Sequence, residues 1–589
     1  MPRSRPSIAS VVASLAPHWT WVALACLAGI ALTAGSIDDG LTRDDFVHLH
    51  IVRRDNPLVT ASLLDMFRTD RGDPAVLSMR IDKGVYPWFT DPQLRVGFFR
   101  PAASITHALD YSLFPGHPAW MHGQNLLWYA LLIAVAGALY RRVLGAGWLA
   151  ALSGLLFAVD YVHGGAVGWI AGRNGLMAGA FGFAAVLLHD HASRDDRLPA
   201  RVASPILLAL SLLSGELGLG AIAWLIAYAL WIDRGSWAVR LRRLIPHLAV
   251  ALVWAAAWIG LGYGARRSGY YVDPRADPLV FLHAIAWNGP GLLARLFIPP
   301  PFIATRWDAL EPAWLRVATQ VAAAGIVGSV AVLGIIRDRN ARFFATGMVL
   351  SVLGVCGTVP DSRLLLLASF GSVGLGAVIV GAGLSRLQPA WRVRMARVPA
   401  RLAATIVLVV FGVLSPIAMP GAASAASRLR LAERRARQGA PLPADLTGRT
   451  IVLLNAPHAF IPSGWFLREA PGDTTPSNVR GLTFGPGTVS VQRRDERTVI
   501  VTPSAGFDSE PVSWLFRRPG SFHTPGERVV LSDMTARVEA VTADGRPAVV
   551  AFRFEVPIEQ SGDLWLAWKG GQWVRFPVPA VGETVVWSD

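Results

Sequence analysis

The sequence predicts a polytopic α-helical membrane protein that carries an all-β domain at its C-terminus. The chain has 589 residues, of which 53% are hydrophobic, and its mean hydropathy is +0.41. Several windows reach the roughly 20 apolar residues that cross a bilayer. From about residue 450 the apolar pattern changes to the alternation that is typical of strands. We therefore expect a membrane domain over residues 1–421, a linker over 422–449 and a β-sandwich-like domain over 450–589.

About eleven apolar windows are expected to span the membrane. Residues 203–232 fit either one long helix or two short helices that meet at Ser214-Gly215-Glu216, and residues 279–298 fit either a span or a segment on one face. The second segment contains Asn288-Gly-Pro-Gly291, which is poor material for a lipid-exposed span, so we expect it not to cross. The windows are about 17–36, 123–140, 148–166, 168–189, 203–215, 217–232, 245–263, 313–336, 343–359, 364–384 and 402–420.

Arginine sets the sidedness of these spans. The formal net charge is +15, and the only lysines are Lys83 and Lys569. The arginines form short clusters between apolar windows, which the positive-inside rule explains without a nucleic-acid partner. A basic stripe with interleaved aromatic residues, which would indicate such a partner, is missing from the sequence. A cytoplasmic N-terminus and two short helices over 203–232 keep these clusters in the cytoplasm: Arg234, Arg240, Arg242, Arg243, Arg337, Arg339, Arg342, Arg386, Arg392, Arg394, Arg397 and Arg401.

We therefore expect a multi-pass protein of the inner cell membrane, with the β-domain outside the cytoplasm. This topology places a long first loop, residues 37–121, on the outer face. Four further segments fall on the same face, and nearly all the polar residues with chemical interest lie in them. These segments are the turn 163–173, the turn at Glu216, the stretch 264–312 and the turn 360–363.

The C-terminal region reads as a series of strands. Turn signals such as Asp544-Gly545 and Gly570-Gly571 divide several of them. Exposed tryptophans could make this domain a glycan-binding module, and an ordinary sandwich core is the other explanation of the same residues. The expected strands are 450–454, 487–491, 498–502, 528–531, 549–556 and 564–568.

Two adjacent carboxylates, Asp44 and Asp45, follow the first window directly, in the stretch Leu41-Thr-Arg-Asp-Asp-Phe-Val-His-Leu-His50. An enzyme that acts on membrane-bound substrates can keep an acid or a base at such a point. A solvated acidic loop is the other interpretation of this motif alone. His48 and His50 alternate with spacing two and, with either aspartate, could bind a divalent ion.

Several motifs on the outer face together resemble those of the GT-C superfamily of membrane glycosyltransferases. In chain order they are Phe98-Phe-Arg-Pro-Ala-Ala-Ser104, His122-Gly-Gln-Asn125, Leu156-Phe-Ala-Val-Asp-Tyr-Val-His163, Ala166-Val-Gly-Trp-Ile-Ala-Gly-Arg173, Ser211-Leu-Leu-Ser-Gly-Glu216 and Pro360-Asp-Ser-Arg-Leu-Leu-Leu-Leu-Ala-Ser-Phe-Gly371. The nearest relatives look like the transmembrane and tetratricopeptide repeat O-mannosyltransferases and their bacterial cousins. Protein O-mannosyltransferases and aminoarabinose transferases are further off. The likeness covers about residues 17–380, and no tetratricopeptide array follows it here.

The resemblance implies an enzyme that transfers a sugar, such as the hexose mannose, from a polyprenyl-phosphate carrier to an acceptor on the outer face, with inversion. The acceptor is a protein, a lipid or a polysaccharide. An acceptor hydroxyl must lose its proton as it attacks, so a carboxylate must lie within hydrogen-bond reach. The departing lipid phosphate gains negative charge, and arginine suits it because its guanidinium binds phosphate bidentately.

The resemblance also implies roles for individual residues. Asp44 is expected to be the base, because the relatives use the first acid of the pair, and Asp45 then positions the acceptor or assists. Arg100 stands where the relatives carry a basic residue near prolines and would hold the carrier phosphate. Glu216 would orient an arginine or a sugar hydroxyl. The remaining expected carrier-phosphate or substrate contacts are Arg173, Arg363, His163, His122 and Asn125; for Arg173 and Arg363, helix-end capping is the alternative.

We expect neither a cofactor nor a resident metal. Transfer from a monophosphate carrier has no pyrophosphate for a metal to bridge, and an isolated histidine at an interface is more often a hydrogen-bonding residue. Cys26 and Cys356 both lie in apolar windows, so a disulfide framework or a cysteine metal site is not expected.

The sequence departs from the relatives at two motifs. Gly165 stands where they carry a glutamate, and Asp160-Tyr161 replaces their His-Pro. The late motif also lacks their tyrosines and proline. These changes fit either an altered choice of sugar or acceptor, or a non-catalytic member. The alternatives to an enzyme are therefore a membrane scaffold or glycan-binding protein, and a transporter of lipid-linked sugars.

Overall fold

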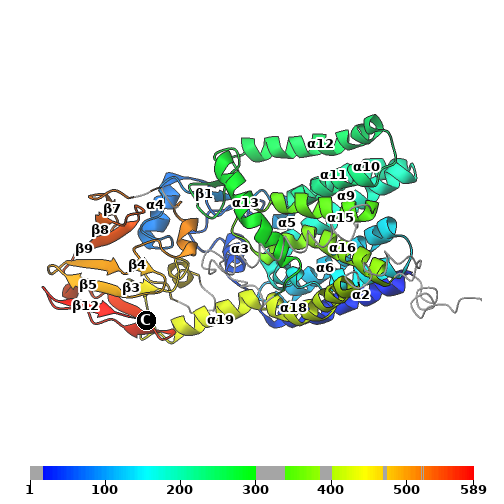
Figure 1. The fold of residues 1–589 in the computed structure, drawn as a ribbon. Helices are drawn as coiled ribbons and strands as arrows, with labels where there is room; N and C mark the ends of the chain where they lie inside the picture. Colours follow the sequence, from blue (N-terminus) through cyan, green and yellow to red (C-terminus); the bar gives the residue numbers. More distant parts are fainter. Residues whose placement is uncertain are drawn as a thin grey trace, which may run out of the picture.

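The structure is a computed structural model that describes residues 18–299, 338–384, 401–467, 474–518, 521 and 523–588. A helical bundle forms one end of the molecule and a β-domain the other (Figure 1). Elements of residues 37–121, the predicted first outer loop and called the first outer segment below, lie between them. The predicted window 313–336 and the predicted cytoplasmic arginines Arg337, Arg386, Arg392, Arg394 and Arg397 lie outside the described residues.

The helical end is that of a polytopic membrane protein. Six of its described helices are long and apolar enough to cross a membrane, and a bent pair of shorter helices, Trp148–Ala158 and Tyr161–Gly168, would make a seventh. The number eleven stays a prediction. The six are Trp19–Asp38, Pro118–Leu144, Ile170–Arg194, Trp237–Gly260, Ser362–Leu384 and Arg401–Gln438.

The helices of the bundle follow the apolar windows in order. Their bounds are α2 (His18–Thr33), α6 (Pro118–Leu144), α7 (Trp148–Ala158), α8 (Gly164–Gly168), α9 (Arg173–Arg194), α10 (Leu198–Ser214), α11 (Leu219–Trp231), α12 (Trp237–Gly260), α13 (Pro278–Arg295), α15 (Arg339–Leu353), α16 (Leu366–Leu384), α18 (Ser415–Ala423) and α19 (Ala425–Gln438). Leu127, Leu252 and Ile417 are 70–73% exposed, although they are large and apolar. Large apolar side chains on a helix surface are favourable in contact with lipid, so their exposure here supports a membrane location.

Two ambiguous stretches take definite forms. Residues 203–232 fold as two short helices, α10 and α11, that meet at a 3-10 turn containing Glu216, as predicted. Residues 278–295 form the single helix α13 with Pro290 inside it, and this helix is not among the six long apolar ones. Most of the predicted linker is helix, because α19 continues directly from α18 with only Ser424 between them.

The first outer segment folds into short elements between the bundle and the β-domain. They are α3 (Asp44–Arg53), α4 (Pro74–Lys83), β1 (Arg95–Gly97) and α5 (Pro101–Leu113). β1 pairs antiparallel with β2 (Gly264–Arg266), so two segments far apart in sequence, both predicted to lie on the outer face, are joined by a strand pair.

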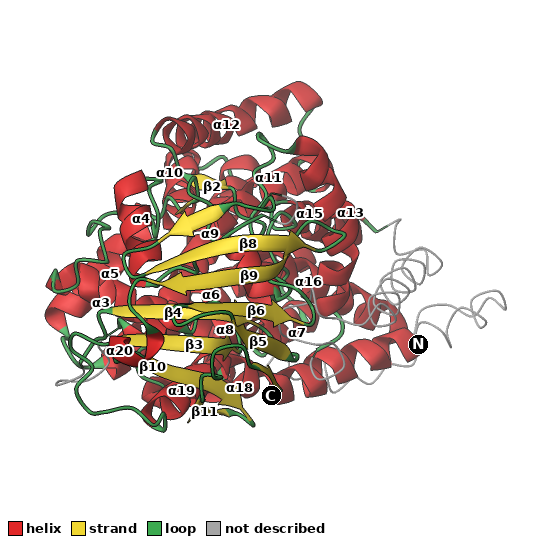
Figure 2. Ribbon diagram, turned by 90° about the vertical axis from the view of Figure 1, so that its left-hand side faces the viewer, coloured by secondary structure: helices red, strands yellow, loops and turns green. Residues whose placement is uncertain are grey.

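The β-domain contains two sheets that share one core (Figure 2). The first has the order β11-β10-β3-β4, in which β3 (Thr450–Ala456) runs parallel to both β4 (Asn478–Phe484) and β10 (Leu564–Lys569), while β11 is Gln572–Arg575. The second is antiparallel, in the order β12-β5-β6-β9-β8-β7. Its strands are β5 (Val489–Arg493), β6 (Thr498–Pro503), β7 (Arg528–Val530), β8 (Met534–Val541), β9 (Pro547–Phe554) and β12 (Thr584–Trp587). The parallel strand pairs of the first sheet distinguish the β-domain from an all-antiparallel sandwich.

The first outer segment supplies part of this core. Trp88 and Phe89 are only 3% and 1% exposed and lie among the aromatic residues of the β-domain. The indole nitrogen of Trp88 donates to the carbonyl oxygen of Leu482 at 3.1 Å, and its ring packs edge-on against Phe552. The β-domain is therefore built around a piece of the N-terminal half of the chain.

Candidate active site

Helix α3 begins with the acidic pair, and its two carboxylates face different surroundings. Asp45 is fully buried. Its Oδ2 accepts from the backbone N–H of Thr42 at 2.8 Å and the Thr42 hydroxyl at 3.0 Å, and its Oδ1 accepts from the N–H of Ala171 at 2.8 Å. Burial raises the pKa of Asp45 to about 7, although these donors oppose the shift. Asp45 thus ties the start of α3 to the turn before α9.

Asp44 is exposed and has neither a hydrogen bond nor an ion pair to any described residue. Surrounding protein nevertheless desolvates it and raises its pKa, while the positive charges of Arg363, Arg43 and Arg100 oppose that shift. Asp44 therefore keeps contact with solvent although the surrounding protein desolvates it. Its free lone pairs and raised pKa suit it to accept a proton.

Arg100, the residue before α5, is held on two sides. Its Nε donates to Oε2 of Glu216 at 2.9 Å, and its guanidinium lies over the rings of Phe98 and Phe67 at 4.3 and 5.0 Å from their centroids. The other oxygen of Glu216 accepts from the N–H of Phe99 at 2.9 Å. Glu216 therefore contacts Arg100 directly, and its role in orienting that arginine for a substrate stays a prediction.

Arg363 has a similar setting. It pairs with Asp361 at 3.3 Å and lies over the ring of Trp169 at 4.7 Å. A Cβ added at Gly165 would lie 3.7 Å from the Cβ of Arg363, so the glutamate of the resembled enzymes would stand beside this arginine. In this chain Asp361 supplies a carboxylate at that point instead.

Two tyrosines that the sequence analysis did not single out complete the group. Tyr270 and Tyr271 have ring centroids 5.3 Å apart, in the outer loop before α13. Burial raises the pKa of both, and the positive charge of Arg363 opposes the shift. Both hydroxyls therefore stay neutral and able to donate. The only signal in the sequence was a Tyr-Tyr pair in a loop predicted to face outward.

Arg173 is not part of this solvent-accessible group. It is fully buried, and its Nη2 lies 2.5 Å from Oδ2 of Asp110 and donates to the carbonyl of Met121 at 2.9 Å. Its Nε donates to Oδ1 of Asn125 at 2.7 Å, and Asn125 in turn donates to the carbonyl of Trp169 at 2.8 Å. Arg173 and Asn125 therefore brace α5, α6 and the turn before α9 from inside.

The two histidines predicted as substrate contacts are also buried. His122 Nε2 lies 3.0 Å from the carbonyl oxygen of Gly40. His163 lies in the bundle between the hydroxyls of Tyr129 at 3.1 Å and Ser369 at 2.9 Å. Buried polar groups need such partners, and here the partners are the turns and helices of the fold.

His48 and His50 turn to different partners rather than to one ion. His48 packs on Phe67 and on His107, with ring centroids 4.8 and 5.1 Å away, and burial lowers its pKa to about 3. His50 Nδ1 lies 2.6 Å from Oδ1 of Asp55. Among the described residues there is no group of three or more histidine, cysteine or acidic side chains that could hold a metal ion.

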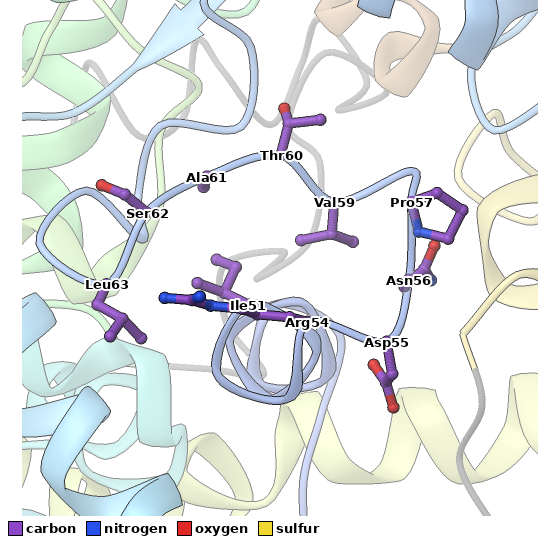
Figure 3. Close-up of a pocket in the computed structure, with 10 residues that line it drawn as sticks. All are labelled: Ile51, Arg54, Asp55, Asn56, Pro57, Val59, Thr60, Ala61, Ser62 and Leu63. Carbon is purple, nitrogen blue, oxygen red and sulfur yellow. The ribbon is translucent and has the colours of Figure 1, made fainter.

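A cavity of about 500 Å³ lies past the other end of α3. Figure 3 shows the loop 54–63 arching over Ile51 and Arg54, with the Asp55 side chain turned away from the loop. The cavity is lined by Ile51, Arg54, Asp55, Asn56, Pro57, Val59, Thr60, Ala61, Ser62 and Leu63. Neither Asp44 nor any of the three arginines lines it, so it is separate from the group around Asp44.

Comparison with known proteins adds little to this geometry. No protein-family model matches the sequence, and no curated protein matches it. Among solved structures the chain is similar to the crystal structure of ArnT from Cupriavidus metallidurans bound to undecaprenyl phosphate. The identity is 13%, the match covers 78% of this chain and 89% of that chain, and the TM-score is 0.35. With a TM-score this low, the fold and chemistry of this chain have to be argued from its own residues.

Proposed function

We propose that this protein is a membrane glycosyltransferase of the GT-C type, which transfers a sugar from a polyprenyl-phosphate carrier to an acceptor on the outer face. The observation that carries the proposal is Asp44, a solvent-accessible carboxylate that has no partner among the described residues and lies within the field of three arginines. The order of the motifs that resemble GT-C enzymes supports the same assignment.

In the proposed reaction the acceptor hydroxyl approaches Asp44 and attacks the anomeric carbon from the side opposite the phosphate. The bond from the acceptor oxygen to that carbon forms as the bond to the phosphate oxygen breaks, so the configuration inverts. The acceptor proton passes to the carboxylate of Asp44. The phosphate departs with the bonding electron pair, and its charge is stabilised by nearby guanidinium groups.

Arg100 and Arg363 are the proposed phosphate ligands. Each is oriented by an acid and an aromatic ring, which leaves part of its planar donor fork for a phosphate. Arg173 is assigned to the scaffold instead, since its guanidinium is buried and engaged. Tyr270 and Tyr271 offer neutral hydroxyls and ring faces to the sugar or the acceptor.

Replacing Asp44 with Asn tests the proposal. Purified protein in lipid is incubated with a panel of polyprenyl-phosphate sugars, and release of the carrier phosphate is measured. We expect the substitution to lower turnover by at least about 100-fold, the lower range for a general base, with the protein still folded in the membrane. Asp38→Asn, at an exposed carboxylate in the same part of the chain, is the matched control and should keep full turnover. Undiminished turnover in the Asp44 variant would refute the assignment.

The alternative of a glycan-binding domain is weakened by the positions of its tryptophans. Trp565 and Trp573 are 7% and 4% exposed and belong to the core. Trp587 donates its indole N–H to the carbonyl of Trp568 at 3.1 Å, so even the half-buried pair is used within the domain. An ordinary β-core accounts for these residues.

A further inference from the structure

The residue before Asp44 has an unusual backbone. Arg43 has φ +33° and ψ −100°, and it is one of few non-glycine residues with positive φ in the described chain. A side chain in this region is strained, and such strain persists only where the surroundings hold it. At Arg43, the surroundings that can hold the strained backbone are the partners of its side chain.

The C-terminal part of the chain holds it. Arg43 Nη2 donates to Oε1 of Glu433, on α19, at 2.6 Å. The same carboxylate oxygen lies 3.1 Å from Nε2 of His458, in the segment that follows β3. The guanidinium also lies over the ring of Phe460 at 5.4 Å from its centroid, and Phe460 packs on Phe516 of the β-domain. One arginine is thus held by a helix and by the β-domain together.

Asp44 lies between two tethered neighbours. Arg43 is fastened to Glu433 and Phe460, and Asp45 is fastened to Thr42 and Ala171. Asp44 itself has no such contact among the residues described. The direction of its carboxylate is therefore set by the backbone on either side of it, and one of the two holds comes from residues nearly 400 positions later in the chain.

We propose that Glu433 and His458 are positioning residues for Asp44, acting through Arg43, so that the C-terminal part of the chain completes the active site. This inference rests on the proposed role of Asp44 as the base. Glu433 supplies the charge that holds the Arg43 guanidinium, His458 fixes the Glu433 carboxylate, and the ring of Phe460 packs against the guanidinium. Release of this hold lets residues 41–44 relax to an ordinary backbone and moves the carboxylate away from the acceptor oxygen.

A double-mutant cycle in the full-length protein tests the inference. Glu433→Gln removes the charge and Arg43→Met removes the guanidinium while keeping most of the length. We expect each single variant to lower kcat about tenfold and to leave KM for the polyprenyl-phosphate sugar within about twofold, because the carrier is held by other arginines. The double variant should lose no more than either single one. Losses that multiply, or a change confined to KM, would overturn the proposal.

The matched control is Glu539→Gln. Glu539 also forms an ion pair with an arginine, Arg494, but in an exposed place on the six-stranded sheet. Turnover of this variant should equal that of the unmodified protein. In His458→Gln the new amide can keep part of the contact with the Glu433 carboxylate, so this variant should lose less turnover than Glu433→Gln. Full activity in both His458→Gln and Glu433→Gln would count against the inference.

A second readout does not depend on activity. Amide hydrogen exchange of a peptide that covers residues 41–50 should be at least several-fold faster in Glu433→Gln than in the unmodified protein, and unchanged in Glu539→Gln. If the unmodified protein releases no carrier phosphate, the proposed function fails, and the exchange experiment still decides whether Glu433 holds the start of α3. If the unmodified protein is active and exchange at 41–50 is the same in all variants, only the positioning inference fails.

Discussion

At the scale of single residues, the surroundings give residues of the same type different roles. Asp44 and Asp45 are adjacent acids, yet one is open to solvent and the other is buried under three donors. Arg100 and Arg173 both come from motifs that resemble carrier-binding sequences, yet only Arg100 keeps part of its surface free. Residue type indicates which chemistry is possible, and burial decides which of two residues of the same type can perform it.

Glu216 gives a prediction at this scale. Glu216→Gln should raise KM for the carrier by about 10- to 100-fold, because a hydrogen bond between two charged groups contributes about 1.5–3 kcal/mol and Arg100 loses its orientation without it. Steady-state kinetics over a range of carrier concentrations measure this. A fall in kcat at unchanged KM would show that Glu216 acts on the chemical step instead.

Asp508 gives a prediction about pH. Burial raises its pKa from 3.8 to about 7, and Arg517 and Arg546 offset only part of this shift. Its φ is +56°, a conformation that asparagine adopts easily. Because the folded state keeps a proton that the unfolded state releases, this group lowers stability progressively as pH rises from about 4 to 7.

Asp508→Asn should therefore stabilise the protein at pH 8 and make little difference at pH 4. Thermal unfolding in detergent at the two pH values checks this, with Glu555→Gln, an exposed acid, as the control. A variant that is equally stabilised at both values would point to the backbone conformation and not to the proton.

Much of the candidate site could be proposed from the sequence, because few polar residues lie between the apolar windows on the face that was predicted to be the outer one. Asp44, Arg100, Glu216 and Arg363 were all indicated by motif and sidedness. The burial of Arg173 and His163 could not be predicted, since it depends on Asp110, Tyr129 and Ser369, which come from three other helices. Tyr270 and Phe460 were missed because neither lies near a recognisable motif.

At the scale of elements, strands with clean alternation were predicted and strands that carry paired charges were not. β4 contains Arg480, a buried residue whose Nη2 lies 2.5 Å from Asp533, and β8 alternates Arg537 and Glu539 with apolar residues. β11 and β12 are only four residues long. Charges that are neutralised by tertiary contacts look like loop residues in a sequence, which is why β4 and β8 were overlooked, and β11 and β12 are too short to show a period.

The insertion of Trp88 into the β-domain gives a prediction for this scale. Trp88→Ala should destabilise the docking of residues 74–98 by about 3–5 kcal/mol, the usual cost of removing a large buried aromatic side chain. Limited proteolysis in detergent would show faster cleavage in the first outer segment. Trp120→Ala, at a tryptophan that is 66% exposed, should leave the cleavage rate unchanged.

At the scale of the whole molecule, the β-domain is docked on the outer segments at several points. Besides Trp88, the N–H of Gly269 donates to the carbonyl of Trp514 at 2.7 Å, and Arg518 pairs with Asp277 at 2.6 Å. The sequence predicted both a membrane domain and a β-domain, because composition changes sharply between them. Their docking could not be predicted, because it depends on pairs of residues hundreds of positions apart.

Truncation after residue 449 should therefore disrupt more than the domain it removes. We expect the remaining protein to insert in the membrane, to show rapid proteolysis of residues 74–98 and to lose carrier-dependent transfer by at least about 100-fold, because Arg43 loses its contact with Phe460 and Trp88 loses its core. Protease mapping of membranes that contain the truncated chain measures the first effect. Full transfer by the truncated protein would show that the β-domain is dispensable.

The core that Trp88 shares with the β-strands also determines when the first outer segment can finish folding during biosynthesis. Trp88 is made first, and Trp565, which belongs to the same core, follows almost 480 residues later in the chain. At about 5–20 residues per second, the interval between them is on the order of half a minute to a minute and a half. During that time Trp88 and Phe89 lack the β-strands that cover them in the finished protein. Uncovered aromatic residues are what chaperones and proteases recognise, so the strands β3 to β12 protect a segment made long before them.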